Sequence, residues 1–261
     1  MHLIDIGANL AHESFAHDLH SVLDHARAVG IEAIVVTGAS EQGSMQAHSL
    51  ASEWPKFLYA TAGVHPHHAA AYSNDTHTIL RDLHRQANVV AVGETGLDYF
   101  RDLSPRLAQQ HAFEQQLELA LACDKPCFLH QRDAHDDFIA ILRQVRHRLS
   151  GCVVHCFTGE KRELYECLDL DCHIGITGWI CDERRGTHLI PLVKAIPSHR
   201  LMIETDAPYL LPRTIKPRPK VHRNEPKFLP QVLAAVAHAR EESVEQLALS
   251  TTATARDFFR L

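Results

Sequence analysis

Short apolar runs alternate with longer stretches of helical periodicity along this chain of 261 residues. Eight runs have the length and the β-branched content of buried strands. They are Leu3–Ile6, Glu32–Thr37, Leu58–Val64, Val89–Gly93, Cys127–His130, Cys152–His155, His173–Thr177 and Leu201–Glu204. Between them, apolar residues recur every three or four positions, which predicts amphipathic helices. These are Phe15–Val29, Ser44–Glu53, Thr76–Gln86, Pro105–Ala122, His135–Leu149, Arg162–Leu168 and Leu189–Ala195, followed after a long loop by Lys227–Arg240 and Val244–Phe259.

The alternation of strands and helices predicts a parallel sheet, because each parallel strand needs a crossover before the next. Eight units of about 30 residues match a (β/α)8 TIM-type barrel, and an open doubly wound sheet is the alternative. No change of composition marks a linker before residue 207, so we expect a single barrel domain over residues 1–261. Two local signals support the helix boundaries: Ser104-Pro105 predicts an N-cap, and Gly30 predicts the end of the first helix.

The composition is that of a globular protein, with 45% hydrophobic and 22% charged residues. A net charge of −6 excludes a surface that is basic overall, so a polyanion has to be met by a local patch or by a metal. The N-terminal residues lack a signal-peptide pattern, and no apolar run approaches membrane-spanning length. We therefore expect a cytoplasmic protein without a membrane partner. The seven cysteines include no C-x-x-C pair and are expected to be reduced thiols.

Several of the predicted strands end in residues that can bind a metal. Glu94 follows the fourth strand, His130 and His155 end the fifth and sixth, and Glu204 and Asp206 close the eighth. In a parallel barrel these ends converge on one mouth, where active sites lie. Burying two carboxylates that share one face of a strand is costly unless a cation or a shared proton compensates. A mixed set of carboxylates and imidazoles suits a divalent cation that activates water.

A structural role is the alternative for each of these residues. A single buried histidine is more often paired with a carboxylate than bound to a metal. Two histidines and two acids, all at strand ends, favour a site. Asp5 on the first strand, and His65 and His67 after the third, are further polar residues at strand ends.

Cations that can bind phosphate follow the seventh and eighth strands. The loop 212–226 carries five Lys and Arg residues against one acid, in a chain that is otherwise acidic. Arginine grips a phosphate through two parallel hydrogen bonds. The candidates for substrate binding are Arg184, Arg185, Arg213, Arg223 and Asn224. A solvated basic loop is the alternative.

Aromatic residues near the same strand ends are a second kind of candidate contact for a nucleic acid. They are Tyr99, Phe100, Phe157, Trp179 and Tyr209. Such rings can stack bases without reading sequence. Ordinary packing within the barrel is the alternative for each of them.

Seven short motifs occur in order through nearly the whole chain. They are Gly63-Val-His-Pro-His67, Gly93-Glu-Thr-Gly-Leu-Asp98, Leu129-His-Gln-Arg-Asp-Ala134, His155-Cys-Phe-Thr-Gly159, Gly175-Ile-Thr-Gly178, Ile203-Glu-Thr-Asp-Ala-Pro-Tyr-Leu210 and Arg223-Asn-Glu-Pro226. Together they resemble the motifs of the TatD family of metal-dependent nucleases, within the amidohydrolase-like barrel hydrolases. Taken singly, several of these motifs are weak. Seven in order are highly specific.

The resemblance implies a set of metal ligands formed by Glu94, His130, His155 and Asp206. It implies that Glu204 is a further acid near the metal and that His65 lies against the scissile phosphate. The activity implied is that of a Mg²⁺-dependent deoxyribonuclease, a 3′–5′ exonuclease on single-stranded DNA, with RNA as a further substrate and a role in DNA degradation or repair. We expect a monomer rather than an obligate oligomer.

One departure from the family pattern concerns the metal. Most members begin with Asp-x-His-x-His-Leu, whereas Asp5–Leu10 reads Asp-Ile-Gly-Ala-Asn-Leu. Both imidazoles are missing, as in the branch around the family's namesake. An oxygen-rich site favours Mg²⁺ over Zn²⁺. Mn²⁺ and Zn²⁺ remain alternatives, and the site holds one or two ions.

The hypothesis for the mechanism is metal-assisted hydrolysis of a phosphodiester. Either Asp206 or Glu204 takes the proton of the attacking water, and His65 contacts the phosphate or the leaving oxygen. Two other classes of function stay open. One is a metal-dependent hydrolase of small-molecule or aminoacyl esters on the same barrel, and the other is a metal-stabilised binding protein without catalysis.

Overall fold

All eight predicted strands are present in the computed structural model, which describes residues 2–217 and 219–261. They are β1 (Leu3–Ala8), β2 (Ile31–Val36), β3 (Leu58–Ala62), β4 (Val89–Asp98), β5 (Cys127–Arg132), β6 (Cys152–Val154), β7 (His173–Ile176) and β8 (Leu201–Ile203). The strands follow one another in sequence order, β1 to β8, in one sheet. This order confirms the (β/α)8 TIM-type barrel, since a doubly wound sheet reverses its strand order at a switch point.

The predicted helices are also found, with shifted ends. They are α1 (Leu19–Ala28), α2 (Glu41–Glu53), α3 (Asn74–Leu83), α4 (Arg106–Cys123), α5 (His135–Val145), α6 (Lys161–Asp169), α7 (Leu189–Leu192), α8 (Leu229–Arg240) and α9 (Val244–Phe259). Short 3-10 helices flank several of them, among them η2 (Pro66–Ala71), η4 (Gly178–Cys181) and η7 (Pro226–Phe228). Within the described residues, none of the helices is long and apolar enough to cross a bilayer.

Two compact units make up the chain. The first consists of the N-terminal residues up to Val36, Cys156–Lys161 and Ile174–Leu261, and the second of Thr37–His155 and Arg162–His173. The expectation of a single domain over residues 1–261 stays a prediction.

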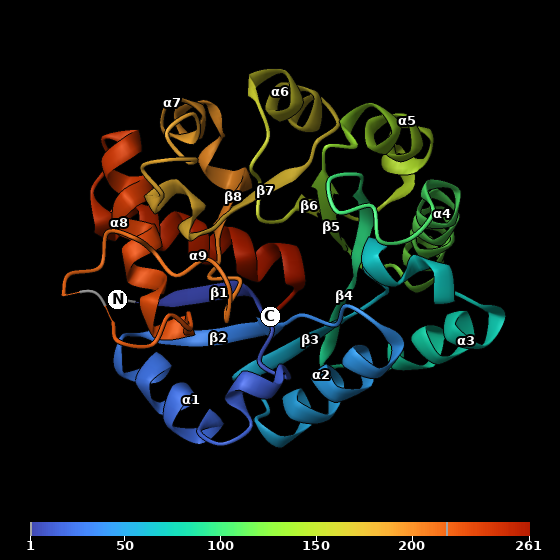
Figure 1. Ribbon diagram of the computed structural model, residues 1–261, viewed down its shortest axis with the longest axis horizontal. Coiled ribbons are helices and arrows are strands. Elements are labelled where there is room, and N and C mark those ends of the chain that lie inside the picture. Colours follow the sequence, from blue (N-terminus) through green and yellow to red (C-terminus); the bar gives the residue numbers. More distant parts are fainter. Residues whose placement is uncertain (1, 218) are drawn as a thin grey trace. The chain divides into compact units, whose positions relative to one another are not determined.

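In the first unit, β1 pairs with β2 and β7 pairs with β8, both in parallel. Helix α9 lies against β1 and β8 (Figure 1). Every residue of β1 is buried. A parallel bridge between Ala8 and Ala207 joins the end of β1 to the segment that follows β8. The residues after β8 are therefore fixed by backbone hydrogen bonds rather than left as a loose loop.

The second unit is built around β4, which pairs with β3 on one side and with β5 on the other. The sequence predicted that this strand ends at Gly93, whereas it runs on to Asp98 and is buried throughout. Gly93 and Gly96 both have φ of +142°. A Cβ would lie 2.1 Å from the carbonyl oxygen of Phe128 at Gly93 and 1.9 Å from that of His130 at Gly96. These glycines let β4 approach β5 closely; they do not end the strand.

Of the two helix-boundary signals in the sequence, the structure confirms one and contradicts the other. Gly30 has φ of +92°, and its N–H donates to the carbonyl of Arg27, as expected of the residue after α1. The expectation that Ser104 caps α4 was wrong, because the cap position is taken by Pro105. The hydroxyl of Ser104 donates instead to the carbonyl of His67 (3.0 Å) and accepts the N–H of Ala70 (3.1 Å).

The thiols agree with the expectation from the sequence, because all seven cysteines are free thiols.

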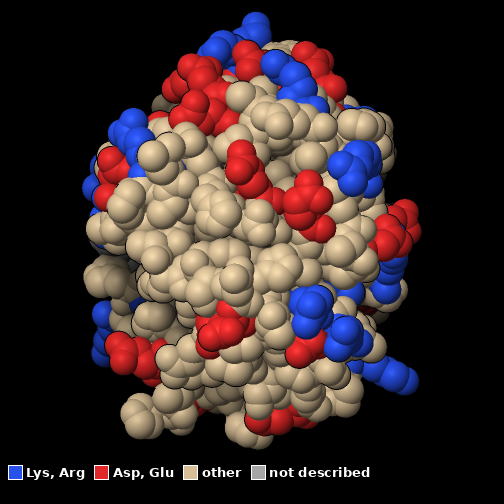
Figure 2. All heavy atoms as spheres, turned by 90° about the vertical axis from the view of Figure 1, so that its right-hand side faces the viewer, with Lys and Arg blue, Asp and Glu red and all other residues tan. Residues whose placement is uncertain are grey.

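The surface charge is mixed on the face that Figure 2 shows. Figure 2 faces the side of the second unit on which α3, α4 and α5 lie, and shows Lys and Arg interspersed with Asp and Glu among uncharged residues. The described residues thus form no broad basic field in this view, and any nucleic acid bound on this face has to be held by local groups.

His84, at the C-terminal end of α3, generates a pH-dependent contribution to stability. It is buried, and its Nε2 lies 3.0 Å from the carbonyl oxygen of Ala62. Burial, helped by Lys125, lowers its pKa from 6.5 to about 4. Between these two values the unfolded chain binds a proton that the folded chain does not. The free energy of unfolding therefore falls as the pH drops from about 6.5 to about 4, and levels off below.

We expect the variant His84→Gln to lose this pH dependence. Its free energy of unfolding should lack a decline of about 3 kcal/mol between neutral pH and pH about 4 that the wild-type protein shows. Urea unfolding over this pH range measures both curves. Parallel curves for the two proteins would contradict the assignment.

Candidate metal centre

Glu94 on β4 lies at the centre of a cluster of imidazoles in the second unit. Its Oε1 is 2.7 Å from Nε2 of His155, 3.1 Å from Nδ1 of His130 and 3.4 Å from Nε2 of His65. His130 lies on β5, while His65 and His155 follow β3 and β6. The structure therefore brings together four of the residues that the sequence singled out.

Backbone hydrogen bonds fix the chain at these positions. The N–H of Glu94 donates to the carbonyl of Gly38 (2.7 Å), and that of His65 to the carbonyl of Ala39 (2.9 Å). The N–H of His155 donates to the carbonyl of Leu129 (2.9 Å). The side chains thus stand on rigid strand ends, which is what a preformed metal or catalytic site needs.

The donor set fits a cation. Three ring nitrogens surround one carboxylate oxygen, which has only two lone pairs. Glu94, His65 and His155 are all at least nine-tenths buried. Hydrogen bonds from the imidazoles alone cannot satisfy this group of atoms, whereas a cation takes a lone pair from the carboxylate and from each available imidazole.

Electrostatics keep Glu94 ionised. Burial alone would raise the pKa of Glu94, but His65, His155 and the hydrogen bonds from the imidazoles hold it well below its usual range. Burial likewise lowers the pKa of His130, but Asp98 and Glu94 outweigh it and leave this pKa raised. The anionic carboxylate is the form that binds a metal, and His130 binds one only after losing the proton that Asp98 and Glu94 stabilise.

Asp98, four residues after Glu94 on β4, extends the cluster. Its Oδ2 lies 2.8 Å from Nε2 of His67 and 3.4 Å from Nε2 of His130. His130 thus has a carboxylate beside each ring nitrogen, although its Nε2 makes no well-directed hydrogen bond with the described residues. Burial opposes ionisation of Asp98, but His130 and His67 hold its pKa well below its usual range. Sequence reasoning missed Asp98, although the spacing Glu94, Gly96, Asp98 puts both acids on one face of a strand.

The tautomer of His65 is set by its own loop. Its Nδ1 accepts the backbone N–H of His67 (3.1 Å). Burial lowers the pKa of His65 well below its usual value, so the ring is neutral at neutral pH. A neutral ring with Nδ1 as acceptor carries its proton on Nε2. His65 therefore presents an N–H donor to the cluster rather than a lone pair.

Two fully buried glutamines on α4 position the cluster, and the sequence reasoning also missed them. Gln116 donates from Nε2 to the carbonyl of Val64 (3.0 Å) and accepts the N–H of Val64 (2.7 Å), immediately before His65. Gln109 accepts the N–H of Asp98 (2.9 Å) and donates to its carbonyl (3.2 Å). The available signal was two glutamines seven residues apart, on one face of an apolar helix.

The predicted acids of the eighth strand lie in the first unit. Glu204 is fully buried, and its Oε1 accepts the N–H of Cys156 at 2.5 Å. Oδ1 of Asp206 accepts a hydrogen bond from the amide of Asn9 (3.3 Å). β8 ends at Ile203, and Asp206 has a left-handed backbone with φ of +55°. Strand alternation, on which the pairing of these acids was based, does not extend to Asp206.

Buried side chains hold the segment that carries these acids. Asp5 accepts the backbone N–H of Thr205 (2.9 Å), and burial raises the pKa of Asp5 to about 7. Asn224 donates from its amide to the carbonyl of Thr205 (2.9 Å), and its backbone N–H donates to the carbonyl of Pro208 (2.9 Å). Asn224 is fully buried in this clamp. Its predicted contact with substrate stays a prediction.

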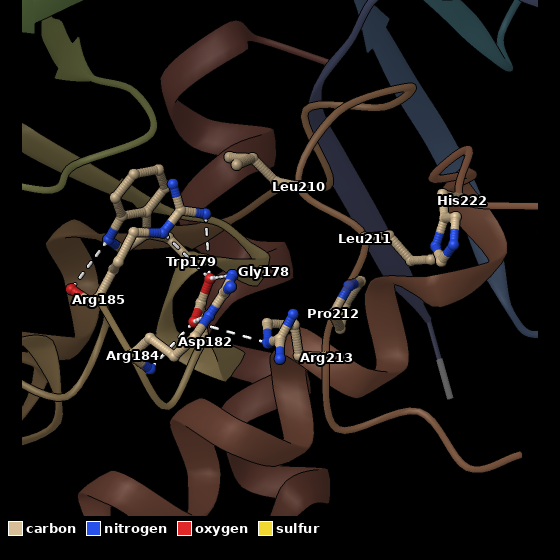
Figure 3. A pocket seen from close by; sticks show the side chains of 10 residues that line it. All are labelled: Gly178, Trp179, Asp182, Arg184, Arg185, Leu210, Leu211, Pro212, Arg213 and His222. Atoms are coloured by element: carbon tan, nitrogen blue, oxygen red, sulfur yellow. Dashed lines mark hydrogen bonds and ion pairs between the residues drawn. The ribbon is translucent and has the colours of Figure 1, made fainter. Parts of the chain in front are cut away.

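Three of the predicted cations meet around one buried carboxylate beside η4. Arg184 and Arg185 both form ion pairs with Oδ2 of Asp182 (3.0 Å each), and Nε of Arg213 lies 3.6 Å from Oδ1. These groups line a pocket (Figure 3). The pocket has a volume of about 260 Å³, and the guanidinium carbon of Arg185 lies 4.3 Å from the ring centre of Trp179. Arg184 and the other guanidinium groups hold the pKa of Asp182 well below its usual range. The result is a fixed group of three guanidinium ions.

Arg223 has a different environment from the other predicted cations. It binds both carboxylate oxygens of Asp18 (2.9 and 2.7 Å) and one oxygen of Glu225 (2.9 Å). Its guanidinium also lies 4.8 Å from the ring centre of Phe15. These contacts tie the loop after β8 to the segment before α1, and a contact of Arg223 with substrate stays a prediction. Arg218 of the same loop lies outside the described residues.

Comparison with known proteins is consistent with this geometry. Residues 4–260 match the family model described as TatD related DNase. The chain is 49% identical over 259 residues to a protein of Erwinia billingiae named 3'-5' ssDNA/RNA exonuclease TatD, with 99% of each chain covered. A protein of the same name from Edwardsiella piscicida is also 49% identical over 259 residues, covering 99% of this chain and all of that one.

A solved structure is also similar over nearly the whole chain. The crystal structure of YJJV, a TatD homologue from Escherichia coli K12, superposes with a TM-score of 0.90 at 27% identity, covering 99% of this chain and 98% of that chain.

Gln116 provides a test of how the cluster is positioned. In Gln116→Leu both backbone groups of Val64 lose their partner in a buried place, so we expect the free energy of unfolding to fall by about 2–4 kcal/mol. Gln115→Leu is the matched control, because Gln115 lies on the same helix and is only half-buried. Urea denaturation compares the two variants. Equal stabilities would show that the Gln116 clamp contributes nothing.

Proposed function

The chain belongs to the TatD family of DNases, and on this premise we propose that it is a divalent-metal-dependent 3′–5′ exonuclease acting on single-stranded DNA and on RNA. The names of the two relatives from Erwinia billingiae and Edwardsiella piscicida support the substrate and the direction of digestion. The single observation that carries the proposal is the buried Glu94 carboxylate with three imidazole nitrogens around one of its oxygens. Such a set suits a metal that activates water.

In this proposal Glu94, His130, His155 and Asp206 hold the metal. Support comes from the contacts of His130 and His155 with Glu94, and from the general rule that the carboxyl ends of barrel strands form one active-site mouth. A divalent cation held by these residues would lower the pKa of a water molecule and offset the charge that develops on the phosphate oxygens. We propose Mg²⁺, with one or two ions in the site, because Asn9 beside Asp206 offers only an oxygen where an imidazole is usual in the family.

The protein side chains supply the proton transfers. Asp206 or Glu204 accepts the proton of the attacking water. His65 is proposed to donate its Nε2–H to an oxygen of the scissile phosphate, a role supported by the acceptor contact at its Nδ1. This donation stabilises negative charge where it develops in the transition state.

We propose that the part of the nucleic acid outside the reaction centre contacts the arginines of the first unit. Arg184, Arg185 and Arg213 retain donors beyond those directed at Asp182 and Glu183, and a phosphate group accepts two such bonds from one guanidinium. Arg223 and Asn224 are proposed to bind substrate as well, although their present contacts hold the loop.

The remaining parts of the proposal concern the cell. We propose a cytoplasmic monomer that takes part in DNA degradation or repair. Hydrolysis of small-molecule or aminoacyl esters is not favoured, because the relatives are named nucleases. A binding protein without catalysis is not favoured either, because the cluster contains more side chains that can bind a metal than a closed structural site needs.

Digestion of single-stranded DNA labelled separately at each end tests the proposed function. The wild-type protein with Mg²⁺ should release the 3′ label stepwise, EDTA should stop it, and Asp206→Asn should reduce the rate by about a hundred-fold or more.

Asp257→Asn is the control, because Asp257 is an exposed acid on α9. Full activity of Asp206→Asn at saturating Mg²⁺ would remove Asp206 from the site. No digestion by folded, metal-bound wild-type protein would contradict the nuclease itself and turn attention to ester substrates.

A further inference from the structure

The loop between β4 and α4 presents large apolar side chains to solvent directly beside the Glu94 cluster. In the loop, Phe100 is 55% exposed and Leu103 62%, and Leu107 in the first turn of α4 is 80% exposed. Single exposed apolar residues are ordinary, but three within eight positions concentrate exposed apolar surface in one short patch of the chain, which calls for a partner. The loop starts immediately after Asp98, whose carboxylate contacts His67 and His130.

This loop is held firmly in place. The carboxylate of Asp98 accepts the N–H of Arg101 (2.8 Å), and Gln109 donates to the carbonyl of Ser104 (2.8 Å). The hydroxyl of Ser104 bonds to η2 through His67 and Ala70. The apolar side chains are therefore exposed on a fixed backbone, not as the result of a loose segment, and a ligand bound there pays little ordering entropy.

Phe100 has the environment of a stacking platform. The guanidinium carbon of Arg132 lies 3.9 Å from its ring centre, so a cation covers one face of the ring. More than half of the residue is nevertheless exposed, so the ring is accessible to a ligand as well. Arg132 lies two residues after His130 on β5, so the cation beside Phe100 and the imidazole beside Glu94 come from the same strand.

The charges next to Phe100 in the chain favour a polyanion. Asp102 is the one acid between residues 99 and 107, and it is paired with Arg106 (3.3 Å), which also lies over the ring of Tyr99. Arg101 adds a second cation to this segment. Tyr99 donates its hydroxyl to Asp137 (2.8 Å), beside a pocket of about 410 Å³. That pocket is lined by Asp133, Asp136, Asp137 and Glu163 against a single arginine, Arg162. A phosphate is attracted to Arg101 and Arg132 and repelled by the acids that line this pocket.

Four of the aromatic residues that the sequence singled out are less suited to this role. Phe157 is buried, Tyr99 is bonded to Asp137, the ring of Trp179 is covered by Arg185, and Tyr209 lies edge-on to His12 in the first unit. Among these five residues, Phe100 combines exposure, a cation on one face and a place two residues after the strand that carries Glu94 and Asp98.

We propose that Phe100, with Arg101 and Arg132, binds one unpaired nucleotide of the substrate strand, the base stacked on the open side of the ring and its phosphate held by the arginines. This inference rests on the proposed nuclease function and deepens it. A base inside a duplex has both faces covered by its neighbours, whereas an unpaired base can turn a face to Phe100, so the loop favours single strands over duplexes. Stacking on an aromatic ring is tolerant of sequence, which suits an exonuclease.

The test is a double-mutant cycle in which Phe100 is substituted in the protein and one base is removed from the DNA. Binding affinity is measured, so the result does not depend on catalysis. Short fluorescent thymidine oligonucleotides are bound in EDTA, each with one base removed at a different position. For the wild-type protein, removal of the stacked base should weaken binding about 5- to 150-fold, and Phe100→Ala should weaken binding of the intact strand by a similar factor. In Phe100→Ala, removal of the same base should cost nothing further.

Three further variants sharpen the test. Phe100→Trp should retain the coupling, and Phe100→Leu should lose it, because leucine keeps the apolar surface without the ring. Tyr165→Ala is the matched control, since Tyr165 on α6 is an aromatic residue of the same unit with 44% exposure; its binding should equal that of the wild-type protein.

Additive effects at every position, or full binding by Phe100→Leu, would overturn the proposal. So would a dimer in sedimentation velocity that dissociates in Phe100→Ala, because the patch would then be a contact between copies of this chain. Failure of the proposed function is distinguishable: strand binding and the coupling to Phe100 would persist while the wild-type protein released no 3′ label in Mg²⁺.

Discussion

Keeping the carboxylate of Glu94 ionised in a buried place is the constraint on which the candidate site depends. Isolated burial of such a charge is strongly unfavourable, and the chain offsets it with three imidazoles from three different strand ends. Those imidazoles need fixed positions, which the parallel strands β3 to β6 and the backbone hydrogen bonds at their ends provide. The close approach of β4 to β5 in turn requires glycine at positions 93 and 96.

Further buried polar side chains support the backbone around the cluster and around the segment after β8. Gln109 and Gln116 satisfy backbone groups on either side of the metal candidates, and Asp5 and Asn224 do so for the segment that carries Glu204 and Asp206. Each of these side chains is buried and hydrogen-bonded, as buried polar groups must be. Their arrangement gives these buried polar residues a structural purpose: they fix the backbone beside the candidate site.

The sequence predicted the fold well because strands and helices have different apolar periods, and all eight strands and the (β/α)8 class followed from that difference. It also predicted that Glu94, His65, His130 and His155 lie together, since strand ends converge in parallel sheets. The prediction from sequence failed at a glycine and a serine, because each of these residue types occurs in more than one structural role. Gly93 was read as the end of a strand but permits close packing, and this error hid Asp98. Ser104 was read as a helix cap but bonds to another segment.

Contacts between distant segments were beyond what the sequence shows. The sequence around Arg223 is typical of an exposed cation in a basic loop. Arg223 is nevertheless bound by Asp18, which is more than two hundred positions away in the chain. The exposure of Phe100 likewise depends on the anchoring of its loop by Gln109 and Ser104, which no local pattern reveals.

The central claim, that the Glu94 cluster is a metal centre, is tested most directly by Mn²⁺ binding to metal-free protein, followed by electron paramagnetic resonance. The account predicts saturable binding by the wild-type protein and an affinity lower by about a hundred-fold or more in Glu94→Gln, which keeps the shape of the side chain and removes its charge. Equal affinities in the two proteins would contradict it, because the buried carboxylate would then have no part in holding a cation.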